Sequence, residues 1–176
     1  MPSDNYRMLC VDPGETTGWS IWKDDKVLGG GQTPLWNFAM DVYNLFESGV
    51  GPLEQGEETI LRPGIDPEEN TGPIGLIVVE AFKLYPWEAR KGTLDWNEFR
   101  TSQLIGALTF FAQLFDVRMH KQDARIKERA LAGGAGELFL KPVHENRHQN
   151  DSIMHGFFYR QVEVHGRNIM LPKKGE

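Results

Sequence analysis

Three separate segments of the chain carry residue types that together could bind a divalent metal ion. Asp12 follows the apolar run in LCVDPG, Glu80 ends the aliphatic run IGLIVVE, and His148 and Asp151 lie three residues apart in RHQND. A carboxylate where a buried strand emerges is costly to desolvate unless a cation compensates its charge. Oxygen ligands with a single imidazole suit Mg²⁺ or Mn²⁺ better than Zn²⁺. A metal-dependent nuclease is therefore the first hypothesis.

Such a site would act on a phosphodiester through two ions. Two ions about 4 Å apart can lower the pKa of an attacking water and stabilise the departing 3′ oxygen. We predict that Asp12 bridges the ions and that Glu80 and Asp151 each hold one. His148 would ligate the second ion or orient water beside it. His155 lies a further turn along the same helix face and is interpreted as a supporting or structural residue.

Each of these residues also has an explanation that involves no metal. Asp12 could cap a tight turn, and Glu80 could be a solvated residue at the end of a strand. His148 and Asp151 could form a surface pair on a helix. The joint occurrence of all four residues favours the metal site over these separate explanations.

The hydrophobic pattern predicts the elements that must position these side chains. Strands are expected over residues 6–11, 17–22, 26–32, 74–79 and 117–120. Helices are expected over 35–48, 98–115 and 145–159, with a helical turn at 126–131. This order predicts an α/β fold with a mixed five-stranded sheet, three antiparallel strands and then parallel ones, flanked by α-helices. If the first and fourth strands are neighbours, Asp12 and Glu80 emerge at the same end of the sheet.

The composition favours one domain over residues 1–176, because 176 residues with 40% hydrophobic content suffice for one sizeable core. Residues 51–73 are rich in glycine, proline and acids and are expected to form a flexible surface insertion. Cys10 is the only cysteine, which favours a reducing, intracellular setting. The chain has no apparent signal peptide or membrane span and is expected to be soluble and cytoplasmic.

The formal net charge of −6 does not exclude a nucleic-acid partner, because the charge is unevenly distributed. Residues 52–73 carry six acids and one base. Residues 118–176 carry eleven bases and seven acids. The basic last third of the chain can therefore still contact phosphates.

Taken in order, these segments resemble the RuvC family of Holliday junction resolvases, which have an RNase H-like fold. The family's Asp-Pro-Gly-x-x-x-Thr-Gly pattern is similar to the stretch from Asp12 to Gly18, with one residue less in the turn. Its second acid after an aliphatic strand corresponds to Glu80. Its long helix with a Gly-Ala step resembles the segment around Gly106, and its last helix carries an Asp or His three residues before a final Asp, as at residues 148 and 151.

The resemblance implies a homodimeric endodeoxyribonuclease of the crossover-junction type, acting in DNA recombination and repair with two Mg²⁺ or Mn²⁺ ions per active site. Its substrate would be branched DNA, either four-way junctions or flaps and forks. The 98–115 helix is a plausible dimer contact. The acidic insertion and the low overall charge resemble bacteriophage-encoded members, which would act in the cytoplasm of a bacterial host.

The resemblance also suggests how DNA would be contacted. Phe82 occupies a place comparable to that of the family's aromatic residue that helps to open the junction. Tyr85 and Trp87 could stack on exposed bases. Further basic residues are predicted phosphate contacts: Lys83, Arg90, Lys91, Lys121, Arg125, Lys127 and Arg129.

Two other classes of function remain open from the sequence. The Asp12-Pro13-Gly14 turn could be the phosphate loop of an actin-like or sugar-kinase type of ATP-binding fragment, although that fold needs a second, similar domain. A non-catalytic protein that binds branched DNA is the other alternative. The four-residue set argues against it.

Overall fold

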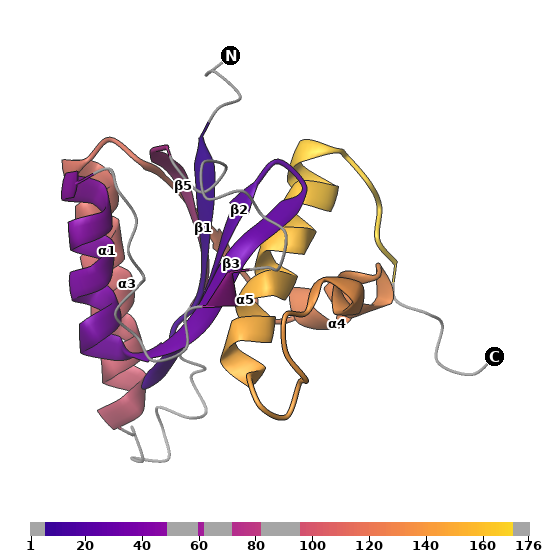
Figure 1. The fold of residues 1–176 in the computed structure, drawn as a ribbon, viewed down its shortest axis with the longest axis horizontal. Coiled ribbons are helices and arrows are strands. Elements are labelled where there is room, and N and C mark those ends of the chain that lie inside the picture. The colour runs from indigo at the N-terminus through magenta and orange to yellow at the C-terminus, as the bar shows by residue number, and fades with distance from the viewer. Residues whose placement is uncertain (1–5, 49–59, 62–71, 82–95, 171–176) are drawn as a thin grey trace, which may run out of the picture.

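A six-stranded mixed sheet forms the centre of the computed structural model, which describes residues 6–48, 60–61, 72–81 and 96–170 (Figure 1). The strand order is β4-β3-β2-β1-β5-β6. The first three strands are antiparallel, and β5 and β6 continue parallel to β1. The bounds are β1 (Arg7–Asp12), β2 (Thr16–Lys23), β3 (Lys26–Pro34), β4 (Ile60–Leu61), β5 (Ile74–Glu80) and β6 (Arg118–Gln122).

The predicted fold class is confirmed. All five predicted strands are present, and they pair as three antiparallel strands followed by parallel ones. The two-residue strand β4 adds an edge next to β3 and comes from the predicted insertion at 51–73. Most of that segment lies outside the described residues.

Helices cover both faces of the sheet (Figure 1). On one face lie α1 (Leu35–Ser48) and α3 (Trp96–Leu114), and on the other lie α4 (Ile126–Ala132) and α5 (Arg147–Phe158). A short 3-10 helix, η2 (Ala135–Leu138), follows α4, and a π-helix, η3 (Tyr159–Val164), continues α5. None of the helices in the described ranges is long and apolar enough to cross a membrane.

The period of two along the strands decides which face each carboxylate points to. Leu9 and Val11 of β1 belong to the core under α1 and α3, whereas Met8 and Cys10 belong to the core under α5. Because side chains alternate along a strand, the next even-numbered residue, Asp12, turns toward α5. In β5, Val79 belongs to the core under α1 and α3, and Val78 belongs to the core under α5. Glu80 therefore also turns toward α5.

Candidate metal centre

Asp12 and Glu80 lie at the same end of the sheet because β1 and β5 are neighbouring parallel strands. Their register pairs Val11 with Val79, one residue before each carboxylate. The expected adjacency of the first and fourth predicted strands is therefore confirmed. The Asp12 side chain is 8% exposed and the Glu80 side chain 22% exposed.

Close packing of α5 on the sheet brings the third segment to these strands. Gly18 of β2 pairs with Asp12, and a Cβ atom built on Gly18 would lie 1.9 Å from the backbone oxygen of His148. The backbone N–H of His148 donates to Oε1 of Gln32 at 3.0 Å, which satisfies one of the first N–H groups of the helix. The first turn of α5 therefore lies directly on β2 and β3, with His148 and Asp151 facing β1.

Lys127 of α4 joins the three carboxylates. Its Nζ lies 3.0 Å from Oδ1 of Asp12, 2.7 Å from Oε2 of Glu80 and 2.7 Å from Oδ2 of Asp151. The other oxygen of Asp12, Oδ2, lies 2.8 Å from Nδ1 of His148. All four predicted ligands thus belong to one connected cluster, which surrounds a cationic side chain.

The electrostatics of the cluster favour the charged forms of Glu80, Lys127 and His148. Burial alone would raise the pKa of Glu80, but hydrogen bonds from His155 and Lys127 outweigh it and lower the pKa to about 2. Burial likewise opposes the charge of Lys127, yet the nearby Asp12, Asp151 and Glu80 raise its pKa. The hydrogen bond to Asp12 is the main cause that raises the pKa of His148. Glu80 is therefore ionised and Lys127 charged at neutral pH.

His155 also belongs to the site, although its place in the sequence predicts a supporting or structural role and not that of a ligand. Its side chain is fully buried, with Nε2 3.0 Å from Oε2 of Glu80 and Nδ1 2.8 Å from Oε1 of Gln122. The signal available in the sequence was its position one helical turn after Asp151. Gln122 carried no comparable signal, because it reaches the site through the pairing of β6 with β5.

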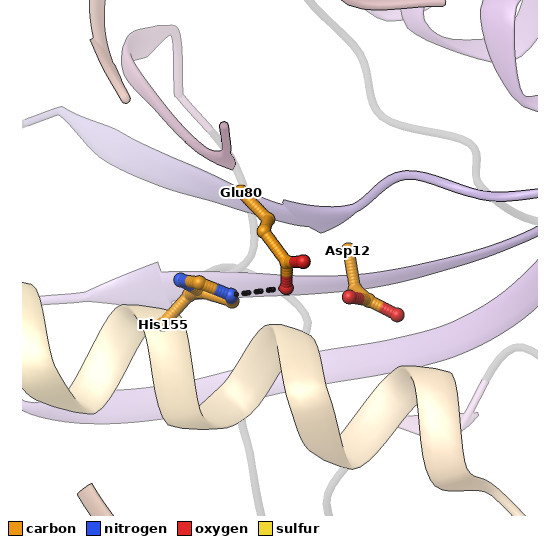
Figure 2. A group of neighbouring side chains, drawn as sticks. All are labelled: Asp12, Glu80 and His155. Atoms are coloured by element: carbon orange, nitrogen blue, oxygen red, sulfur yellow. Dashed lines mark hydrogen bonds and ion pairs between the residues drawn. The ribbon is translucent and has the colours of Figure 1, made fainter. Parts of the chain in front are cut away.

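Asp12, Glu80 and His155 offer ligand atoms that all lie within 4.8 Å of one another (Figure 2). Asp151 connects to this group through Lys127, and His148 through Asp12. Three carboxylates that gather around one partly buried ammonium group show that positive charge is needed at this place. The oxygen-rich donor set fits a hard divalent cation such as Mg²⁺ or Mn²⁺.

The predicted DNA contacts differ in where they lie. Lys121 and Arg125 are exposed on β6 and on the turn before α4. Arg129 is partly buried, and its guanidinium lies 4.8 Å from the centre of the Phe158 ring. Its Nε–H donates a hydrogen bond to the backbone oxygen of Ile169. Lys127 lies among the carboxylates, as described above. The other predicted contacts are outside the described residues: Phe82, Lys83, Tyr85, Trp87, Arg90 and Lys91.

Comparisons with known proteins support the fold. No protein-family model and no curated protein sequence matches the chain. Among solved structures, Thermus thermophilus RuvC in complex with a Holliday junction substrate is 15% identical, with a TM-score of 0.58 over 92% of this chain and 96% of that chain. A second structure of T. thermophilus RuvC is 14% identical, with a TM-score of 0.57 over 91% and 96% of the two chains. The chain therefore has a RuvC-like, RNase H-like fold.

Proposed function

We propose that the protein is a structure-selective DNA endonuclease that resolves Holliday junctions or other branched DNA by metal-dependent phosphodiester hydrolysis. The observation that carries this proposal is the convergence of carboxylates from β1, β5 and α5 on one cation, the Lys127 ammonium group. Carboxylates this close repel one another unless positive charge lies between them. The likeness to T. thermophilus RuvC, solved with a Holliday junction substrate, supports the same function.

The proposed cofactor is a pair of Mg²⁺ or Mn²⁺ ions. We assign Asp12 to both ions, Glu80 and Asp151 to one each, and His148 to the second ion or to the water beside it. The two oxygens of Asp12 already accept hydrogen bonds from different partners, Lys127 and His148, which supports a bridging role. When bound, such ions would activate a water nucleophile and stabilise the departing 3′ oxygen.

Lys127 has two roles in this proposal. In the geometry described above, its ammonium group neutralises part of the charge of three carboxylates. A bound metal would use the same carboxylate oxygens, and Lys127 would then lose some of its three contacts. Its ammonium group would become available to a DNA phosphate, together with the exposed Lys121 and Arg125.

The expected result for substrate choice is a preference for branched DNA. With Mg²⁺ or Mn²⁺, a synthetic four-way junction should be cut roughly 100-fold faster than linear duplex of the same sequence, which corresponds to about 3 kcal/mol. Parallel cleavage assays with four-way, flap, fork and linear DNA measure this preference. Equal rates on linear duplex would refute structure selectivity. ATP hydrolysis without DNA cleavage would support the ATP-binding alternative instead.

A homodimer is part of the proposal, and the outer face of α3 supports it. One side of α3 packs on the sheet through Leu104 and Leu108, while Phe110 and Leu114 on the other side are 59% and 55% exposed. A Cβ atom on Gly106 would meet nothing within 4 Å, so a partner could approach closely there. Two large exposed apolar side chains beside an open glycine are typical of a contact surface.

Charge introduced on this face should separate the dimer. We expect Phe110→Asp to weaken self-association by roughly 100-fold or more, because the carboxylate would be buried in an apolar interface. Sedimentation velocity over a concentration series measures the effect. The matched control is Val164→Asp, since Val164 is also exposed but lies on η3, on the opposite side of the sheet. A wild-type protein that stays monomeric at all concentrations would rule out the dimer.

A further inference from the structure

We infer that His155 is a positioning residue that holds the Glu80 carboxylate in place for metal binding, with Gln122 fixing the imidazole ring. This inference rests on the proposed function and deepens it. Figure 2 shows His155 reaching from α5 to one oxygen of Glu80, while the second oxygen lies on the side of Asp12. The hydrogen bond from Nε2 to Oε2 is 3.0 Å long.

Glu80 needs such a support more than Asp12 does. A glutamate side chain has one more rotatable bond than an aspartate and loses more rotamer entropy when it is held in a single geometry. Glu80 also lies at the last residue of β5, where its side chain is 22% exposed, against 8% for Asp12. Without a fixed donor, the Glu80 carboxylate could therefore leave the site more readily.

The direction of the hydrogen bond follows from the chemistry of the partners. Oε2 of Glu80 also lies 2.7 Å from Nζ of Lys127, and an ammonium group can only donate, so this carboxylate oxygen acts as an acceptor. Nε2 of His155 must therefore carry the proton. This conclusion holds for either orientation of the Gln122 amide. As assigned, Oε1 accepts from Nδ1–H and leaves the buried Nε2 of Gln122 without a partner, whereas the flipped amide donates to Nδ1.

The ring can change its position little. His155 is fully buried, and both of its nitrogens are bound to side chains from the paired strands β5 and β6, where Glu80 lies opposite Gln122. The next residue, Gly156, packs so tightly that a Cβ atom there would lie 2.3 Å from Nε1 of Trp22. At this turn α5 therefore packs closely on the sheet and holds the imidazole ring beside Glu80. The position of α5 then determines the position of the Glu80 carboxylate.

A competing role for His155 is direct ligation of the metal through Nε2, which lies within 4.8 Å of the ligand atoms of Asp12 and Glu80. That role would require loss of the Nε2 proton and of the buried hydrogen bond to Glu80. Mg²⁺ and Mn²⁺ prefer oxygen ligands, so replacing the hydrogen bond to Glu80 by a bond from Nε2 to the metal is unfavourable for the proposed ions. The positioning role keeps both the proton and the hydrogen bond.

Binding of Mn²⁺ alone, without DNA, tests this role. Glutamine places an N–H donor near the position of the histidine Nε2, whereas leucine has similar bulk and no donor. We expect His155→Leu to weaken Mn²⁺ affinity by about tenfold or more. His155→Gln should stay within about threefold of the wild type. Electron paramagnetic resonance of free Mn²⁺ measures both affinities, and His144→Gln, at a side chain that is 80% exposed, is the control.

Unchanged affinity in His155→Leu would overturn the inference, as would equal losses in the leucine and glutamine variants. The ring proton provides a second readout. Nitrogen-15 NMR of the histidine rings should show an Nε2–H signal that disappears in His155→Gln and persists in the wild type when Mg²⁺ is added. Loss of that proton with Mg²⁺ would indicate ligation instead. If Mn²⁺ binds as expected but no DNA is cut, the proposed function fails while the positioning role stands.

Discussion

Asp12→Asn is expected to abolish DNA cleavage while leaving binding of branched DNA intact. Asparagine has nearly the shape of aspartate but loses the negative charge and one of the two acceptor oxygens that contact Lys127 and His148. A loss of roughly 4 kcal/mol of transition-state stabilisation would lower the cleavage rate by about 10³-fold. Binding should stay the same or become tighter, because one negative charge near the phosphates is removed.

The measurement compares single-turnover cleavage with binding of the same four-way junction in Ca²⁺ or without metal. Asp151→Asn should behave in the same way, since Oδ2 of Asp151 contacts Lys127 in the same cluster. Glu128→Gln is the matched control, because Glu128 is an exposed acid next to Lys127 on α4. Cleavage at the wild-type rate by both Asp variants would refute the nuclease assignment.

Gly18→Ala is expected to produce the second large effect, on both stability and activity. A Cβ atom on Gly18 would lie 1.9 Å from the backbone oxygen of His148 and 2.7 Å from the backbone nitrogen of Gln149. Neither atom is a flexible side-chain end, so the whole first turn of α5 has to move. Such overpacking costs on the order of 3 kcal/mol, which lowers the melting temperature by about 10 °C for a chain of this size.

The same shift would move His148 and Asp151 away from Asp12, and a misplacement of about 1 Å can lower activity by roughly 100-fold. Thermal unfolding and cleavage of the four-way junction measure the two effects. The control is Gly136→Ala, since a Cβ atom there would meet only Leu131, at 4.0 Å. Wild-type stability and activity in Gly18→Ala would show that α5 does not depend on this close approach.

Much of the fold and part of the site could be predicted from local pattern. Continuous apolar runs end at Asp12 and at Glu80, and the two strands are parallel neighbours, which is the condition for both carboxylates to emerge at one end of the sheet. Their side chains also face the same helix, because the period of two along each strand sends Met8, Cys10 and then Asp12 to the α5 side. The strand ends and the facing of these side chains depend on the order of residues within a single element, whereas the pairing of β1 with β5 follows the connection rules for parallel strands.

The role of Lys127 could not be predicted in this way. In the sequence it is one of several basic residues between β6 and η2, and this position predicts only a phosphate contact. It reaches Asp12, 115 positions earlier in the chain, and Asp151, 24 positions later. The contacts of His155 and Gln122 could not be predicted from local pattern either, because their partners lie on other elements.

Residue order alone established the α/β architecture, the acids at the strand ends, and the single helix face shared by His148, Asp151 and His155. Only the tertiary structure established which cation lies among the acids, which donor holds Glu80, and why Gly18 must lack a side chain. The physical reason is the range of the interactions. Periodicity and turn chemistry act over a few neighbouring residues. The contacts within the site join α4, α5 and the strands β1, β5 and β6, and these contacts exist only after the elements have packed together.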